Sequence, residues 1–362
     1  MSSETAPVRF LQIEPTTRCN FTCGFCAGRA MPQTDLPWER FVAALDAFPG
    51  LEHIELQGEG EPLMHHRFFD MVKLARDRGI KVSIITNGSL FTDDAIKKIL
   101  ALGIDKIAVS IESPDAERFQ QIRGGKLDKV IRGITALMAA RNEQQLQRPS
   151  VGLSITVLRS TQQDLPQILA LYEQLGLDAG VTLQPLQAME VYTRHYDEAL
   201  RSELLDEREA DGIFARFFSD ADVRRIQAAR KGARGFFDEL MSGWKPARGT
   251  CPWLERGLYV HNGGAVTACC MVKDTANHAF GKLDAGTGPA LLAARDEMRA
   301  ALARREVPTP CAGCELARFA VMGRMQLIRF GLRGLRERWF GAPAREGKDG
   351  KRTVRLPVVD TR

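Results

Sequence analysis

The chain has 362 residues, of which 44% are hydrophobic and 26% are charged, a composition typical of a globular protein with about two domains. No apolar run approaches the roughly 18 residues that a membrane span requires, and residues 1–7 lack the apolar core of a signal peptide, so we expect a cytoplasmic protein. The net charge of +5 is modest and much of the excess lies in the C-terminal tail, so charge indicates no nucleic-acid partner.

Short β-rich runs alternate with amphipathic helical runs over residues 10–187, the pattern of βα units around a parallel sheet. Strands are expected at residues 9–14, 53–57, 81–86, 106–111, 152–158 and 180–185. Helices are expected between them at residues 38–48, 66–78, 93–102, 127–145 and 163–175. Eight such units would close a complete TIM barrel, whereas six are found here. The pattern therefore predicts an α/β fold with a partial (β/α)6 TIM-like barrel over residues 1–188.

Three cysteines lie on one short loop just after the first expected strand. Cys19, Cys23 and Cys26 have spacings of three and two residues, and three thiolates at this spacing can hold three corners of a cubane iron–sulfur cluster. The fourth iron then has no protein ligand. A closed zinc site needs four ligands and no fourth Cys or His is near, while an odd number of thiols without an export signal argues against disulfides. Three incidental thiols are the alternative.

With Phe25 before the last cysteine, this loop resembles that of the radical S-adenosylmethionine (SAM) superfamily. The resemblance implies a 4Fe–4S cluster on Cys19, Cys23 and Cys26 that binds SAM at its open iron. Reductive cleavage of SAM then yields methionine and a 5′-deoxyadenosyl radical, which abstracts a substrate hydrogen. The resemblance also implies an electron donor of the flavodoxin or ferredoxin type.

The turn after the second expected strand resembles a second element of this family. Gly60-Glu61-Pro62 matches the end of a Gly-Gly-Glu-Pro element that pairs with the amino group of SAM. Glu59 occupies the position of the first glycine of that element. Glu59 is therefore a candidate to face the substrate instead. An ordinary strand-to-helix turn is the alternative.

Further contacts with SAM are implied at the ends of later strands. Thr86 and Asn87 lie in a Thr-Asn-Gly element, Ser110 ends the fourth strand, and Arg123 would suit a bidentate contact with a carboxylate. Thr156 and Gln184, on the fifth and sixth strands, are candidates for the pocket floor or the substrate. Ser and Thr at strand ends also serve as turn or cap residues.

A change of pattern follows the sixth strand. Residues 189–250 are expected to form a helical connector with helices at 190–218 and 223–244. Residues 251–315 are expected to form a small α+β unit that contains a hairpin over 257–270, in which Asn262-Gly263 predicts a type I′ turn.

The remaining cysteines gather in this second unit. Two flank the hairpin and two form a knuckle with a two-residue spacing, and together they can close a four-thiolate site. The arrangement resembles the auxiliary iron–sulfur domain called SPASM, in its shortened twitch form with one 4Fe–4S cluster, because no cysteine follows the knuckle. The implied ligands are Cys251, Cys269, Cys311 and Cys314.

Two alternatives remain at this second site. The same four thiolates could hold structural zinc. Cys270 could replace Cys269 as a ligand, be a small buried thiol, or donate a hydrogen atom to a substrate radical. We expect Cys269 to be the ligand because of its spacing from Gly264, and because neighbours on a strand point to opposite faces.

Residues 316–362 are expected to form a basic helix and tail. Arginines alternate with apolar residues over 316–340, a pattern that fits contact with an anionic membrane surface. Packing of the apolar face on the body of the protein is the interpretation that we favour.

The sequence therefore predicts a radical SAM oxidoreductase. A single auxiliary cluster suits a two-electron oxidation, or an epimerisation, of a small polar substrate such as a sugar or cyclitol. The few residues before the first strand favour a small substrate over a ribosomal peptide, although a peptide maturase with a separate leader-binding partner is the alternative. A non-catalytic iron–sulfur or zinc sensor or scaffold is the alternative of another class. Candidates for a catalytic acid, base or hydrogen donor are Glu59, His65, Gln187 and Cys270.

Overall fold

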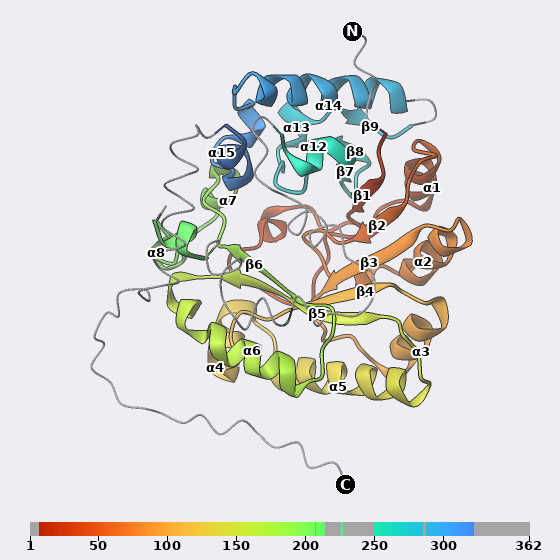
Figure 1. Ribbon diagram of the computed structural model, residues 1–362, viewed down its shortest axis with the longest axis vertical. Coiled ribbons are helices and arrows are strands. Elements are labelled where there is room, and N and C mark those ends of the chain that lie inside the picture. Colours follow the sequence, from red (N-terminus) through yellow and green to blue (C-terminus); the bar gives the residue numbers. More distant parts are fainter. Residues whose placement is uncertain (1–6, 207, 214–225, 227–249, 285–286, 322–362) are drawn as a thin grey trace.

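A single nine-stranded sheet lies at the centre of the molecule. The computed structural model describes residues 7–206, 208–213, 226, 250–284 and 287–321. The sheet has the order β6-β5-β4-β3-β2-β1-β7-β8-β9 (Figure 1). Its strands are β1 (Phe10–Ile13), β2 (His53–Leu56), β3 (Lys81–Thr86), β4 (Lys106–Ser110), β5 (Ser150–Val157), β6 (Val181–Pro185), β7 (Gly257–Val260), β8 (Ala265–Thr267) and β9 (Gly281–Lys282).

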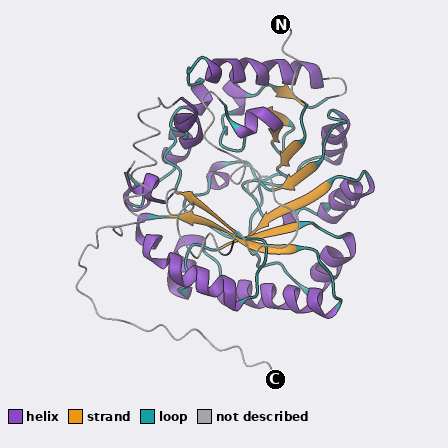
Figure 2. Ribbon diagram, viewed as in Figure 1, coloured by secondary structure: helices purple, strands orange, loops and turns teal. Residues whose placement is uncertain are grey.

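Strands β1 to β6 are parallel neighbours, and helices cover their outer face (Figure 2). This is the predicted α/β partial barrel. The covering helices are α1 (Trp38–Asp46), α2 (Phe68–Asp77), α3 (Asp93–Leu102), α4 (Ala116–Arg123), α5 (Leu127–Glu143) and α6 (Leu165–Gln174). All five predicted helices are present, and α4 is an additional helix that the sequence patterns did not indicate.

Local sequence explains why some element boundaries matched the predictions. Helix α3 begins after Thr92, whose side chain accepts a hydrogen bond from the Ala95 backbone N–H, and it ends at Gly103 in the left-handed conformation (φ +63°). The buried side chains of α3 include Ile96 and Ile99, at helical spacing. The capping residues and the buried apolar residues therefore predict the same helix bounds in this segment.

The C-terminal region continues the sheet of the barrel. Strand β7 pairs in parallel with β1, and β8 pairs antiparallel with β7, as the predicted hairpin requires. The helices of this region are α12 (Pro252–Arg256), α13 (Thr275–His278), α14 (Gly288–Ala303) and α15 (Glu315–Val321), and they lie together at the upper end of the molecule in Figure 1. The second cysteine group is thus attached directly to the first strand of the barrel.

The predicted type I′ turn of this hairpin is wrong. A type I′ turn needs positive φ at both central residues, but neither Asn262 nor Gly263 has a positive φ, and Gly264 does (φ +81°). The Asn262 amide donates to the Thr34 hydroxyl at 2.6 Å, and its backbone N–H donates to Glu14 at 3.2 Å. Contacts with the barrel loops, rather than local turn preference, accompany this conformation.

The predicted single helix over residues 190–218 is also wrong. The described part of this segment breaks into α7 (Glu190–Thr193), α8 (Glu198–Ser202) and a helical stretch at 208–213. Asp197 caps α8 by accepting the Leu200 backbone N–H at 2.8 Å, which starts a new helix. The predicted helix at 223–244 lies outside the described residues apart from residue 226, and the predicted basic helix and tail lie outside them beyond residue 321.

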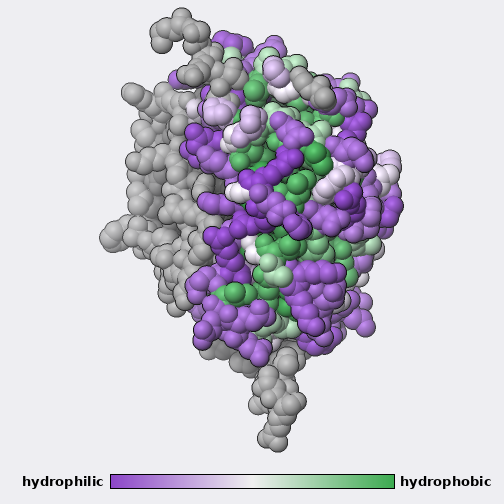
Figure 3. Space-filling view, turned by 90° about the vertical axis from the view of Figure 1, so that its right-hand side faces the viewer, coloured by the Kyte–Doolittle hydropathy of each residue, from purple (hydrophilic) through white to green (hydrophobic). Residues whose placement is uncertain are grey.

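Among the helices of the described residues, none is both long and apolar enough to cross a membrane. On the face in Figure 3, hydrophobic side chains lie between stretches of hydrophilic ones rather than in a continuous apolar belt.

Candidate active site

The loop that carries Cys19, Cys23 and Cys26 is held by the turns that follow several barrel elements. The Thr22 backbone N–H donates to the Arg123 carbonyl at the end of α4, at 2.9 Å. The Glu61 backbone N–H, after β2, donates to the Arg18 carbonyl at 2.8 Å. Backbone contacts from two distant turns therefore fix the start and the middle of the cysteine loop.

Asparagines add a third attachment. The Asn87 amide, after β3, donates to the Asn20 side chain at 2.9 Å, and the Asn20 amide donates to the Ser89 hydroxyl at 2.8 Å. The Asn87 amide also lies 3.9 Å from the Cys19 sulfur. This places a hydrogen-bond donor of the Thr-Asn-Gly element beside the first cysteine.

Two glycines permit these close approaches. A Cβ at Gly60 would lie 2.3 Å from the Thr16 carbonyl oxygen. A Cβ at Gly124 would lie 1.8 Å from the Thr22 hydroxyl, and Gly124 has a φ of +68°. A larger residue at either position would displace the cysteine loop.

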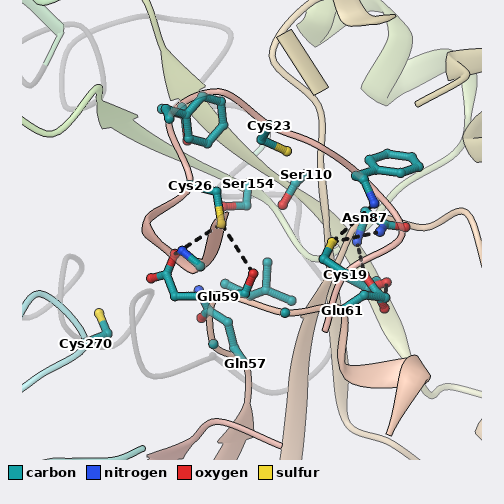
Figure 4. A pocket seen from close by; sticks show the side chains of 18 of the residues that line it. Cys19, Cys23, Cys26, Gln57, Glu59, Glu61, Asn87, Ser110, Ser154 and Cys270 are labelled. Carbon is teal, nitrogen blue, oxygen red and sulfur yellow. Dashed lines mark hydrogen bonds between the residues drawn. The ribbon is translucent and has the colours of Figure 1, made fainter. Parts of the chain in front are cut away.

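The three cysteines of this loop are free thiols that lie around one cavity (Figure 4). Burial raises the pKa of Cys23 to about 11, and burial together with Glu59 raises that of Cys26 further. Burial favours the neutral form of these thiols even though Arg123 lies near Cys23 and lowers its pKa, and a bound metal cluster reverses this preference by supplying positive charge. The donor set therefore fits an iron–sulfur cluster with one open position.

Glu61 connects two of the expected SAM elements. Its carboxylate accepts hydrogen bonds from the Thr86 hydroxyl and the Asn87 backbone N–H, both at 2.7 Å. Burial raises the pKa of Glu61 although these hydrogen bonds oppose the shift. The carboxylate thus organises the loop after β3 as well as its own turn.

Arg123 has a partner that sequence patterns did not indicate. Its guanidinium forms a buried ion pair with Glu112, and one nitrogen lies 3.8 Å from the Cys23 sulfur. Burial alone would lower the pKa of Arg123, but Glu112 raises it. Its Cζ also lies 5.8 Å from the centre of the Phe25 ring. The described geometry therefore places Arg123 beside the cysteine loop with its charge balanced by Glu112.

Glu59 also has a buried partner, and this one comes from the C-terminal region. Lys273 Nζ lies 2.6 Å from one Glu59 oxygen, and the Cys26 sulfur lies 3.3 Å from the other. Burial would raise the pKa of Glu59, but the Lys273 ammonium holds it below its usual range. Likewise, Glu59 raises the pKa of Lys273 against the effect of burial. This ion pair joins the two halves of the molecule at the cavity wall.

The cavity has a volume of about 230 Å³ and brings together most of the side chains predicted from the sequence. Its lining includes Cys19, Cys23, Phe25, Cys26, Glu59, Gly60, Glu61, Thr86, Asn87, Ser110, Arg123, Thr156, Gln184, Gln187 and Cys270. Figure 4 shows Cys270 approaching from the side opposite Cys23 and Ser110. The barrel and the C-terminal region therefore share this cavity.

Two predicted residues do not line it. Pro62 is buried at the start of a short 3-10 helix, Pro62–Met64. His65 Nε2 lies 3.1 Å from the Leu36 carbonyl, and its Nδ1 accepts the Arg67 backbone N–H at 3.1 Å. Both ring nitrogens of His65 are thus engaged in local structure, away from the cavity.

Several cavity side chains were absent from the sequence predictions. They are Gln12, Glu55, Ser83, Lys106, Ser154, Thr182, Tyr192, Tyr196 and Lys273. The strand residues among them alternate with buried apolar residues, as in β1 and β3, so strand alternation could have identified them. Lys273 had no comparable sequence signal because its role depends on how the C-terminal region folds onto the barrel.

The second cysteine group lines a separate, largely apolar cavity of about 390 Å³. Its four members are Cys251, Cys269, Cys311 and Cys314, and they pack with Leu254, Ala268, Val272 and Leu302. Burial raises the pKa values of Cys251 and Cys311 to about 12. Cys270 lines the first cavity instead, so adjacent cysteines face different cavities.

Comparison with known protein families matches residues 13–171 to the Radical SAM superfamily. The Pyrococcus furiosus tungsten-containing aldehyde ferredoxin oxidoreductase cofactor-modifying protein is 32% identical over 206 residues, which is 53% of this chain and 56% of that protein. The Methanosarcina barkeri AdoMet-dependent heme synthase is 26% identical over 182 residues, 49% of this chain and 50% of that protein. The chain thus spans about half the length of these curated relatives.

Among solved structures, Streptococcus suis SuiB bound to S-adenosylmethionine has a similar fold. The TM-score is 0.61 with 14% sequence identity, and the match covers 90% of this chain and 75% of that one. This similarity extends beyond the barrel into the C-terminal region.

Proposed function

We propose, from the match of residues 13–171 to the Radical SAM superfamily, that the protein cleaves SAM reductively and oxidises a small polar substrate. Cys19, Cys23 and Cys26 would hold the SAM-binding 4Fe–4S cluster. When bound, this cluster supplies the electron that splits SAM into methionine and a 5′-deoxyadenosyl radical. The chain holds the three thiols on one buried loop, fixed by Gly60, Gly124 and their contacts.

We further propose that Cys251, Cys269, Cys311 and Cys314 hold an auxiliary 4Fe–4S cluster, as in a twitch domain. The four cysteines come from three separate segments and line one largely apolar cavity. Four thiolates gathered in this way can hold a 4Fe–4S cluster, and structural zinc is the alternative.

The observation that carries the oxidation proposal is the wall between the two cavities. Thr182, Gln184, Leu186, Gln187 and Met271 line both of them. A substrate in the first cavity would therefore lie one layer of side chains from the second cysteine group. Short separations of this kind suit electron transfer between a substrate radical and a cluster.

The proposed reaction converts a secondary alcohol carbon to a carbonyl. The substrate C–H hydrogen passes to the adenosyl radical and gives 5′-deoxyadenosine. The resulting substrate radical would lose one electron, which a cluster held by Cys251, Cys269, Cys311 and Cys314 would accept, and its hydroxyl would lose one proton. An external reductant of the flavodoxin or ferredoxin type supplies the electron that cleaves SAM.

The test is anaerobic incubation of the reconstituted protein with dithionite and SAM, followed by mass spectrometry of the nucleoside products. We expect 5′-deoxyadenosine and methionine in equal amounts, and none when dithionite is omitted. An iron-loaded protein that binds SAM but yields no 5′-deoxyadenosine would point to the sensor or scaffold alternative. A peptide substrate, the other alternative, would appear as peptide-dependent stimulation of the same product.

A further inference from the structure

The interior of the partial barrel is polar where a closed barrel is usually filled with branched apolar side chains. Strand register places Gln12, Glu55, Ser83 and Lys106 opposite one another on β1, β2, β3 and β4. All four line the first cavity and are at least nine-tenths buried. We refer to these four residues as the barrel floor.

Gln12 is the distinctive member of the barrel floor. It is 1% exposed, and within the described part of the chain neither its amide nitrogen nor its amide oxygen has a hydrogen-bond partner. Burying an unpaired amide costs about 1–3 kcal/mol. Because Gln12 lines the first cavity, a ligand bound there could supply the missing donor and acceptor.

Along the strands, the barrel floor lies closer to the strand N-termini than the expected SAM contacts do. Ser83 precedes Thr86 by three residues on β3, which corresponds to about 10 Å along a strand. Residues on the way are small or apolar, including Ala108 and Ile85, and they also line the cavity. A molecule on the floor could therefore extend upward toward the position where SAM is expected.

The charges around the cavity indicate the class of ligand. Arg123 is paired with Glu112, and Lys273 is paired with Glu59. Lys106 lies opposite Ser83 on the neighbouring strand, and Ser83 in turn lies opposite Glu55. The buried positive side chains are thus accompanied by carboxylates, while Arg29 lies exposed at the cavity lining, and this balance disfavours a phosphorylated ligand on the barrel floor. The other polar groups are hydroxyls and amides, from Ser110, Ser154, Thr156, Thr182 and Gln184.

We propose that the barrel floor is a subsite for an uncharged polyhydroxylated ligand of the sugar or cyclitol type, recognised through the Gln12 amide. A hydroxyl group donates and accepts at one atom, so it satisfies both halves of this amide. The proposal rests on the proposed function, because it assigns the substrate of that same cavity to a chemical class and to a named residue.

The first test uses stability, which needs no ligand. Gln12→Leu removes an unpaired buried amide and keeps a similar volume, so it should raise the Tm of the full-length, ligand-free protein by about 2 °C or more. Asn262→Leu is the matched control, because the buried Asn262 amide donates to Thr34, and it should lower the Tm. A lower Tm for Gln12→Leu would overturn the proposal, since it would give the amide a purely structural role.

The second test measures binding by anaerobic calorimetry with SAM present. The probes are myo-inositol, methyl α-D-glucopyranoside, inositol 1-phosphate and the tripeptide Ala-Ser-Ala. One of the two uncharged polyols should have the highest affinity of the four probes. Gln12→Leu should lower that affinity tenfold or more, which corresponds to about 1.4 kcal/mol. Best binding of the phosphate or the peptide, absence of polyol binding, or an unchanged affinity in Gln12→Leu would each overturn the proposal.

Deuterated polyol separates this inference from the proposed function. The wild type should transfer deuterium into 5′-deoxyadenosine, and Gln12→Leu should lose this transfer while it still cleaves SAM. This result would support both the subsite and the proposed function. If the wild type binds polyol without cleaving SAM, the subsite stands and the proposed function fails. If it cleaves SAM but no polyol binds, only the subsite fails.

Discussion

The two cysteine groups of this protein are built in opposite ways. Cys19, Cys23 and Cys26 lie within one short loop and face a cavity with charged and hydroxyl side chains. The other four ligand candidates come from three separate segments and face a cavity of mainly apolar side chains. The first group is defined by local sequence, whereas the second is assembled by packing between separate segments of the C-terminal region.

This contrast also suggests a division of roles. A polar cavity with hydrogen-bond donors suits the binding of SAM and a substrate, while an apolar enclosure suits a site that exchanges electrons and excludes water. The shared wall at β6 and Met271 lies between them. The following changes test whether the two sites are separable, beginning with the largest expected effect.

Replacing a cysteine of the loop should abolish SAM cleavage. Cys23→Ser retains nearly the same volume but lacks the thiolate that a cubane iron requires. We expect 5′-deoxyadenosine to fall below detection and the iron content to fall from about eight to about four per chain. Substantial cleavage by this variant, measured by mass spectrometry, would contradict the assignment of the loop.

Replacing a cysteine of the second group should separate cleavage from product formation. Cys314→Ser is expected to reduce iron to about four per chain while the N-terminal loop remains loaded. Uncoupled formation of 5′-deoxyadenosine should continue, but oxidised product should be lost. Equal loss of both would mean that the two sites do not have separate roles, and one zinc with four irons in the wild type would revise the metal at this site.

The Glu59–Lys273 ion pair is the buried charged contact between the two regions at the cavity wall. Lys273→Met would leave the Glu59 carboxylate buried beside Cys26, and breaking a buried pair in this way costs about 3–5 kcal/mol. The double variant Glu59→Gln with Lys273→Met should recover most of this loss, as measured by anaerobic urea titration. Additive losses would contradict direct coupling between these side chains.

The smallest effect is expected at Cys270. Its side chain lines the first cavity rather than the second, so Cys270→Ala should leave iron content unchanged. Cys269→Ala is the matched comparison and should lose about four irons. The reverse result would make Cys270 the ligand. Loss of product by Cys270→Ala with full iron content would instead favour its role as a hydrogen donor.

Much of the fold was predictable because it follows from short-range patterns. The strand Lys81–Thr86 and the helix Asp93–Leu102 have the bounds expected from their alternation, helical spacing and Thr92 cap. The three-cysteine loop was equally local. The conformation of the Asn262-Gly263 turn was not predictable in this way, because Asn262 contacts Glu14 and Thr34 in the barrel loops.

The sequence by itself determined which residues carry chemistry: the two cysteine groups, the Gly60-Glu61 turn and the polar ends of the strands. Only the tertiary structure decided which of them meet. It paired Arg123 with Glu112, brought Lys273 to Glu59, separated Cys269 from Cys270, and buried Gln12 without a partner. The physical reason is that each of these contacts joins side chains from different elements, and no local pattern encodes a contact whose partner lies in another element. For Lys273 and Glu59, the pairing of β1 with β7 brings together segments far apart in the chain.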